Sequence, residues 1–253
     1  MEIGNVEKQI TGRLSSRCLH FSLIDPDPKK LKIGEIIDRV ELLEKYGTSA
    51  FMVGGSTGVT QKVLDAAVAA IKDHSKLPVI LFPGNADTGI SKYADAIFFM
   101  SLLNSKSQLW ITGMQARGAN AVKQAGIEPI PMAYLIIEPG MKVGKVGKAK
   151  VIKQNEHYKA AAYALAAQYF GMRFVYLEAG SGATKPVPDE MIMIVSGTVQ
   201  IPIIVGGGLR SAEAVERKLR AGADIIVTGT AIENDFNKMK EIVHVIKRYR
   251  KIQ

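Results

Sequence analysis

The chain has 253 residues, of which 47% are hydrophobic and 23% charged, a balance typical of a globular protein with a large core. Its formal net charge of +9 favours anionic partners: nucleic acid, an acidic membrane surface or phosphorylated metabolites. No DNA- or RNA-binding motif is present and no apolar run approaches the roughly 20 residues that span a bilayer, so we expect neither a nucleic-acid-binding nor a membrane-spanning protein.

Short apolar runs alternate with longer amphipathic stretches along the whole chain. The runs are rich in Val, Ile and Phe and lack strict alternation, which indicates parallel strands buried on both faces. In chain order the predicted strands are 18–24, 50–53, 78–82, 96–100, 130–137, 174–177, 201–205 and 225–227. The predicted helices between and after them are 33–46, 60–74, 108–125, 157–170, 188–198, 211–221 and 232–249.

Eight strands with intervening helices form either a closed barrel or a doubly wound sheet. A dinucleotide-binding sheet carries its glycine fingerprint after the first strand, where this chain instead reads Asp25-Pro26-Asp27-Pro28. We therefore predict an α/β fold, a (β/α)8 TIM barrel forming one domain over residues 1–253. Its third helical unit, 84–93, is predicted to be shortened, and segment 138–154, rich in Gly and Lys, to be a mobile loop. The single cysteine, Cys18, fits a reducing compartment such as the cytoplasm.

Glycines follow the last two strands of the predicted barrel, at the end where such barrels hold their active sites. Gly206-Gly207-Gly208 precedes one helix and Gly229-Thr230 precedes the last. Because glycine lets backbone N–H groups approach an anion and a helix N-terminus adds its dipole, these loops favour a bound phosphate. The alternative is that they only make tight strand-to-helix turns.

Three other strand ends carry polar side chains. Glu178 ends the sixth strand and could act as a general base, or simply cap its loop, and Tyr176 lies two residues earlier on the same face. Asp25 and Ser56 follow the first two strands and offer hard oxygen ligands for Mg²⁺, although Asp25 could instead cap the Asp-Pro turn.

Five blocks, in order and spread over nearly the whole chain, resemble the geranylgeranylglyceryl phosphate synthases, which make the first ether bond of archaeal membrane lipids. The blocks are His20-Phe21-Ser22-Leu23-Ile24-Asp25-Pro26-Asp27, Gly54-Gly55-Ser56, Tyr176-Leu177-Glu178-Ala179-Gly180-Ser181-Gly182, Val205-Gly206-Gly207-Gly208-Leu209-Arg210 and Gly229-Thr230. The third block is the most specific, since glycine clusters alone fit many phosphate-binding barrels.

The resemblance implies a reaction and a set of site residues. The C3 hydroxyl of sn-glycerol 1-phosphate would be joined to geranylgeranyl diphosphate with release of diphosphate. Glu178 would orient or deprotonate that hydroxyl, and Asp25 and Ser56 would hold Mg²⁺. The residues implied to bind glycerol 1-phosphate are Tyr176, Leu177, Glu178, Ala179, Gly180, Ser181, Gly182, Gly207, Gly208, Gly229 and Thr230. The prenyl tail would need an apolar groove, for which the short third unit leaves room.

Two departures from the family pattern bear on these expectations. The first strand reads Leu23-Ile24-Asp25-Pro26-Asp27 where one branch has Lys-Leu-Asp-Pro-Asp, which places the chain in the other branch and implies a homo-oligomer, hexamer or dimer. Gly229-Thr230 replaces the Gly-Asn of many members, and both pairs offer a backbone N–H and a polar side chain.

Three rival functions remain open from the sequence. The nearest is a related synthase for a different prenyl chain length. Another phosphate-binding barrel, an isomerase, would need an acid/base pair at opposed strand ends, and Asp25 has no convincing partner. A non-enzymatic protein that contacts membranes through its basic surface is the third, and peripheral membrane contact is also compatible with the synthase.

Overall fold

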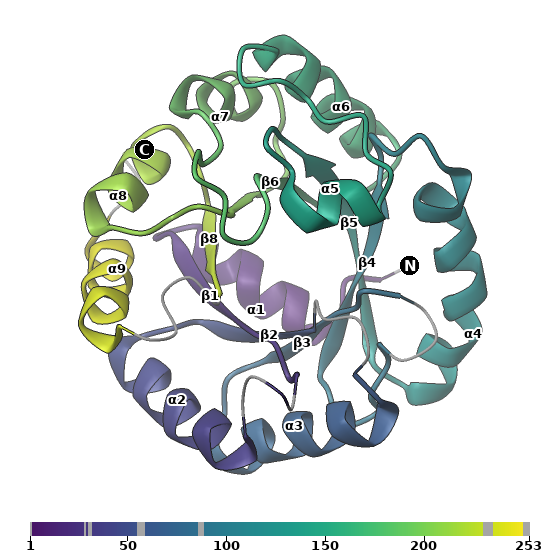
Figure 1. Cartoon of the computed structure of the whole chain (residues 1–253), viewed down its shortest axis with the longest axis vertical. Coiled ribbons are helices and arrows are strands. Elements are labelled where there is room, and N and C mark those ends of the chain that lie inside the picture. Colours follow the sequence, from purple (N-terminus) through teal and green to yellow (C-terminus); the bar gives the residue numbers. More distant parts are fainter. Residues whose placement is uncertain are drawn as a thin grey trace.

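The computed structural model describes residues 2–27, 29, 32–54, 59–85, 89–229 and 235–249. Eight parallel strands pair in sequence order into a closed barrel, and helices surround it (Figure 1). The strands are β1 (Leu19–Ile24), β2 (Ala50–Gly54), β3 (Val79–Phe82), β4 (Ala96–Leu102), β5 (Glu128–Ile136), β6 (Phe174–Glu178), β7 (Ile203–Gly206) and β8 (Ile225–Thr228). The predicted α/β fold with a TIM barrel is confirmed.

The helices on the outside of the barrel match those predicted between the strands. They are α2 (Ile33–Tyr46), α3 (Gln61–His74), α4 (Met114–Ala125), α6 (His157–Tyr169), α7 (Asp189–Ser196), α8 (Ala212–Arg220) and α9 (Phe236–Arg248). The predicted helix 108–125 begins with a wider π-helical turn, η1 (Leu109–Gly113). Among the described residues, no helix is long and apolar enough to cross a membrane.

The core has two layers, as the doubly buried strands predict. Side chains that point into the barrel form one cluster, which includes Phe21, Phe98 and Phe174. Side chains that point outward pack against the helices in a second cluster, which includes Leu177 and Val205. The alternation along each strand therefore decides which residues can reach the barrel mouth and which are used to hold the helices.

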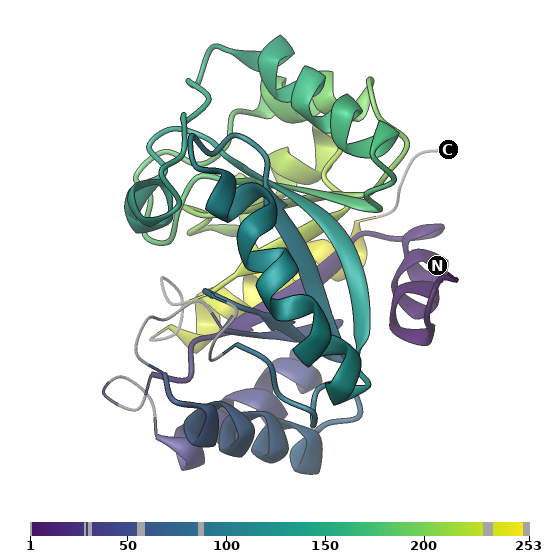
Figure 2. The ribbon, with the colours of Figure 1, turned by 90° about the vertical axis from the view of Figure 1, so that its right-hand side faces the viewer.

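The helix α1 (Asn5–Leu14) was not predicted from the sequence. Val6, Ile10 and Leu14 recur every four residues and pack onto the interior cluster of the barrel. The carboxylate of Glu128 accepts hydrogen bonds from the backbone N–H groups of Val6 (2.8 Å) and Glu7 (2.9 Å) at the start of the helix. Helix α1 thus closes the end of the barrel opposite α5 (Met141–Val146; Figure 2).

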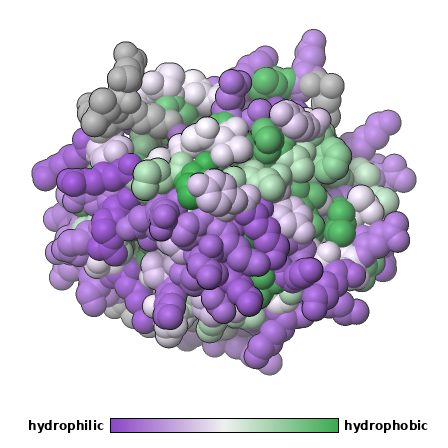
Figure 3. All heavy atoms as spheres, turned by 90° about the horizontal axis from the view of Figure 1, so that it is seen from above, coloured by the Kyte–Doolittle hydropathy of each residue, from purple (hydrophilic) through white to green (hydrophobic). Residues whose placement is uncertain are grey.

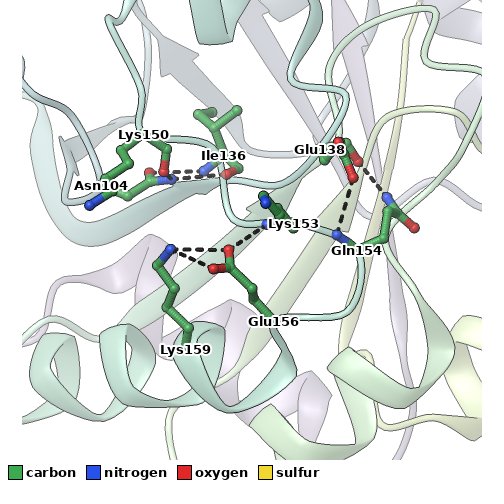
Figure 4. A network of polar contacts seen from close by, with 8 residues as sticks. All are labelled: Asn104, Ile136, Glu138, Lys150, Lys153, Gln154, Glu156 and Lys159. Carbon is green, nitrogen blue, oxygen red and sulfur yellow. Dashed lines mark hydrogen bonds and ion pairs between the residues drawn. The ribbon is translucent and has the colours of Figure 1, made fainter.

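The segment expected to be a mobile loop, 138–154, instead carries helix α5 and is tied down at several points. Asn104 donates to the backbone oxygens of Ile136 (2.9 Å) and Lys150 (3.1 Å). The Gln154 backbone N–H and side-chain amide both donate to Glu138 (Figure 4). A helix of six residues has too few turns for its periodicity to be recognised in the sequence, and this segment is rich in lysine and glycine. Helix α5 was therefore not predicted.

The third helical unit was expected to be shortened. The described residues between β3 and β4, which are 83–85 and 89–95, contain no helix. Residues 86–88 lie outside the described part of the chain, so the shortened unit stays a prediction.

Candidate active site

The candidate site lies at the barrel mouth, where helix α5 crosses in front of the strands (Figure 1). Asp25 follows β1, Glu178 ends β6, Gly206 ends β7 and Gly229 follows β8. Glu178 pairs in register with Gly206 across the β6–β7 ladder. Adjacent parallel strands thus bring the predicted carboxylate and the predicted glycine cluster together, while Ser56 and Thr230 fall outside the described residues.

Glu178 is buried and held by its own loop. Its side chain is 7% exposed, and Oε1 accepts a hydrogen bond of 2.6 Å from the backbone N–H of Gly180. Burial raises the pKa of this carboxyl, while hydrogen bonds from Tyr176 and Gly180 act against that rise. A fixed carboxylate with a raised pKa is suited to take a proton from a bound hydroxyl.

Tyr176 supports Glu178 from inside the barrel. It is fully buried, and its ring centroid lies 5.2 Å from that of Tyr134 and 5.8 Å from that of Phe82. Burial, together with the charge of Glu178, holds the pKa of Tyr176 well above its usual value. The phenol therefore stays protonated and donates a hydrogen bond to the carboxylate, which fixes the carboxylate's position.

The glycines at the end of β7 leave room for these two side chains. A methyl group added at Gly206 would overlap the Tyr176 hydroxyl, and one added at Gly207 would overlap Glu178 Oε1. Gly207 also has φ of +83°, which side chains disfavour, and its added methyl would lie 2.7 Å from the backbone N and O of Gly180. The glycine cluster of β7 is thus shaped around the β6 loop, beyond any role as a tight turn.

A side-chain contact joins the same two loops near the surface. Arg210 donates from Nη2 to the backbone oxygen of Gly182 at 3.0 Å. Ser181 and Gly182 are exposed at the mouth, so their backbone groups are open to a ligand. The structure therefore places the β6 and β7 loops, which carry the expected glycerol-phosphate residues, side by side.

Two of the expected substrate-binding residues point elsewhere. The side chains of Leu177 and Ala179 are fully buried in the layer between barrel and helices. The backbone oxygen of Ala179 accepts a hydrogen bond of 2.9 Å from the N–H of Gly140. Their side chains hold the loop in place and do not face the mouth, which follows from strand alternation after Tyr176.

His20 is a buried polar residue beneath the end of β8. Its Nδ1 lies 2.9 Å from Thr48 Oγ1 and its Nε2 lies 2.8 Å from Thr228 Oγ1. The Thr48 hydroxyl donates to the His20 backbone oxygen at 3.2 Å, so its oxygen accepts from Nδ1–H and leaves Nε2 to accept from Thr228. Burial lowers the pKa of His20 to about 3, so this neutral imidazole holds Thr228 just before Gly229.

Asp25 is the described residue that fits a magnesium ion. It is half-buried after β1 and lines the cavity at the mouth. Among the described residues no group of three or more His, Cys, Asp or Glu could hold a metal. A single carboxylate suits Mg²⁺, which keeps several waters and takes further oxygens from substrate phosphates.

A largely apolar cavity of about 310 Å³ lies at the mouth. Asp25, Tyr134 and Ser181 are among its lining residues, and its walls come from the β3–β4 region, η1 with α4, and α5. The apolar residues that line it include Phe82, Ile90, Ile97, Phe98, Phe99, Met100, Leu102, Trp110, Met114, Val122, Val143 and Val146. The cavity is therefore a largely apolar channel whose lining also includes the carboxylate of Asp25 and Ser181 of the β6 loop.

One repeat in the sequence could have indicated this channel but was not recognised as a channel wall. Trp110, Met114, Gly118 and Val122 recur every four residues along η1 and α4, and all four line the cavity. A helix face of this kind is usually core, but here Gly118 opens space against the barrel. The other wall comes from α5, which the sequence did not reveal.

Comparison with known proteins shows which family the chain belongs to. Residues 13–246 match the family model described as the PcrB family. The geranylgeranylglyceryl phosphate synthase of Pyrococcus horikoshii is 54% identical over 253 residues, which cover 100% of this chain and 97% of that protein. The same-named enzyme of Thermococcus gammatolerans is 59% identical over 233 residues, 92% of this chain and 91% of the relative.

A solved structure agrees closely with the fold. The (S)-3-O-geranylgeranylglyceryl phosphate synthase of Thermoplasma acidophilum, in complex with its substrate sn-glycerol-1-phosphate, superposes with a TM-score of 0.92. It is 43% identical, and the match covers 98% of this chain and all of that one. The similarity therefore extends over the barrel as a whole and includes the mouth.

Proposed function

We propose that this chain, which belongs to the PcrB family, is a geranylgeranylglyceryl phosphate synthase. It transfers the geranylgeranyl group from its diphosphate to the C3 hydroxyl of sn-glycerol 1-phosphate and releases diphosphate. The observation that carries this proposal is the apolar channel whose lining includes Asp25, Ser181 of the loop that holds Glu178, and Tyr134, which packs against Tyr176. An ether-forming prenyltransferase needs this combination of an apolar channel, a base and an anion site.

The reaction assigns one role to each part of the mouth. The oxygen of the C3 hydroxyl forms a bond to C1 of the prenyl chain, the bond from C1 to the diphosphate oxygen breaks, and the hydroxyl proton passes to Glu178. The Tyr176 phenol keeps the accepting carboxylate in position. Backbone groups of Gly207 and Gly208, with Gly229 and Thr230, hold the glycerol phosphate, so the two reactants meet in a fixed orientation.

Asp25 and Ser56 would hold Mg²⁺ against the diphosphate. When bound, the ion supplies positive charge that stabilises the leaving diphosphate. Asp25 lines the cavity at the end where the polar part of a prenyl diphosphate would lie, and this supports its assignment. The prenyl tail would extend from there along Trp110, Met114 and Val122.

A product assay tests the function directly. The purified protein is incubated with sn-glycerol 1-phosphate, Mg²⁺ and one prenyl diphosphate at a time: farnesyl, geranylgeranyl or heptaprenyl. We expect the geranylgeranyl ether as main product. A preference for heptaprenyl diphosphate would favour the related synthase with a longer chain, and absence of any ether product would refute the prenyltransferase assignment.

We also propose that the chain forms a homo-oligomer, a hexamer or a dimer. The outer face of α6 and α7 exposes Tyr158, Tyr169, Phe170 and Met193, with Phe170 75% exposed. Figure 3 shows this side of the molecule, where a band with many apolar residues lies above a hydrophilic area. Grouped apolar side chains of this kind favour contact between subunits. Light scattering of Phe170→Ser and Met193→Ser variants should show smaller assemblies than the unchanged protein.

A further inference from the structure

Helix α5 and the chain after it carry a dense positive charge at the barrel mouth. Residues 139–153 contain no Asp or Glu and five lysines, which are Lys142, Lys145, Lys148, Lys150 and Lys153. All five are exposed. The concentration of one sign of charge on a short exposed segment indicates an anionic partner.

The other side of α5 is packed into the site. Gly144 and Gly147 are buried, and methyl groups added there would meet Ile136 and Leu102 respectively. Val143 lines the apolar channel, and the N–H of Gly140 bonds to Ala179 beside Glu178. Helix α5 therefore forms a wall of the channel to which Lys142 and Val143 contribute, whereas Lys145 and Lys148 are exposed and do not line the channel.

Exposed apolar side chains accompany the lysines at the channel's edge. Met141 is 37% exposed and Val146 is 44% exposed on α5, and Leu109 on η1, next to the channel residue Trp110, is 46% exposed. Lys106 joins the same edge, since its backbone N–H bonds to the Lys148 oxygen at 2.9 Å. We call these six residues the docking rim: Lys106, Leu109, Met141, Lys145, Val146 and Lys148.

The docking rim is held in a fixed shape. Ser105 donates to the Gly147 oxygen at 2.7 Å, and Asn104 bonds to the Lys150 oxygen at 3.1 Å. The network beyond it, drawn in Figure 4, continues through Lys153 to Glu156 at the start of α6. A fixed rim presents its charges and apolar groups together, without the entropy cost of ordering a loop on contact.

We propose that the docking rim binds the surface of an anionic lipid bilayer. Its lysines match anionic headgroups, and Leu109, Met141 and Val146 can enter the boundary between headgroups and acyl chains. This inference rests on the proposed function, because docking here would place the channel's edge against the membrane from which a prenyl substrate is drawn. The rim gathers exposed charge and exposed apolar side chains next to the channel wall, a combination that fits a lipid surface better than a water-soluble anion.

Vesicle binding tests the proposal. The full protein is sedimented with vesicles of phosphatidylglycerol and phosphatidylcholine, or of phosphatidylcholine alone. The variant Lys145→Glu/Lys148→Glu is compared with Lys45→Glu/Lys123→Glu, whose lysines are exposed in the last turns of α2 and α4, away from the mouth. Both double substitutions lower the net charge by four units, so the comparison separates the position of the charge from its amount.

The expected result is binding to the anionic vesicles alone and a loss on the order of tenfold for the rim variant but not for the control. Equal binding by the two variants, or no preference for anionic vesicles, would overturn the proposal. A change in oligomeric state confined to the rim variant would assign the surface to a second copy instead. With detergent-dispersed prenyl diphosphate the rim variant should form normal amounts of ether, so a protein inactive in that assay fails as a synthase whatever its vesicle binding.

Discussion

The buried imidazole of His20 makes a quantitative prediction about acid stability. In the folded protein the pKa of His20 is lowered to about 3 by burial, whereas an unfolded histidine titrates near 6.5. Above about pH 6.5 the residue is neutral in both states and costs nothing. As the pH falls below that value, His20 becomes protonated in the unfolded chain but stays neutral in the folded protein, so the free energy of unfolding decreases.

The size of the effect follows from the two pKa values. By pH 4.5 the contribution of His20 to the loss of unfolding free energy should reach roughly 2–3 kcal/mol, and near pH 3 it should reach roughly 4 kcal/mol. Other groups titrate in the same range, so the test is a difference between variants. His20→Gln removes the titrating ring, and Thr228→Val removes one of its hydrogen bonds but keeps the ring.

The measurement is the free energy of unfolding from urea titrations between pH 7.5 and 4.5 in steps of about half a unit. We expect His20→Gln to be less stable at neutral pH but to lose stability more slowly on acidification, by about one proton of linkage. Thr228→Val should be destabilised at every pH with the slope of the unchanged protein. A His20→Gln slope equal to that of the unchanged protein would show that the ring is protonated in the folded state, and the assigned tautomer would be wrong.

Three further predictions concern the reaction. Glu178→Gln keeps the shape of the side chain but cannot accept a proton, so turnover should fall on the order of a hundredfold or more. Binding of glycerol 1-phosphate should be retained. Near-normal turnover at saturating substrates would show that Glu178 is not a catalytic base. Gly208→Val should raise the KM for glycerol 1-phosphate far more than that for the prenyl diphosphate, because φ is +72° there and the added carbon would lie 2.9 Å from the Ala183 oxygen. Asp25→Asn should raise the Mg²⁺ concentration needed for product formation, while calorimetry shows unchanged glycerol 1-phosphate binding; loss of that binding would make Asp25 a structural acid.

The parts of the fold that depend on residue periodicity could be predicted from the sequence. The strands were recognisable because both faces are buried and each run is continuously apolar, and the glycine ends of the last strands indicated the mouth. Helix α1 was missed because Val6, Ile10 and Leu14 are only three apolar residues among polar ones. Helix α5 was missed because glycine and lysine do not reveal a six-residue helix, although it forms a wall of the channel.

The parts of the candidate site that depend on position along a strand could also be predicted from the sequence. Glu178 and Tyr176 stood out because they share a strand face next to glycine, and the structure brings them into contact. The side-chain positions of Leu177 and Ala179 could also be inferred from strand alternation, yet a sequence motif treats every residue in a block alike. The resemblance to the family gives a set of residues. The alternation of side chains along the strand then separates those that point to the mouth from those that hold the loop in place.

The clearest feature of the mouth is that two neighbouring strands are fitted to each other residue by residue. Tyr176 reaches the place where Gly206 has no side chain, and Glu178 reaches the corresponding place at Gly207. The two strands are joined in sequence only through α7, but the register that pairs Glu178 with Gly206 brings the large side chains of one against the glycines of the other. Gly207 therefore leaves room for the carboxylate, because any side chain at 207 would push Glu178 away from the Gly180 N–H that holds it. The proposed base and the proposed anion site are thus parts of one packing arrangement, and a substitution in either strand should disturb both.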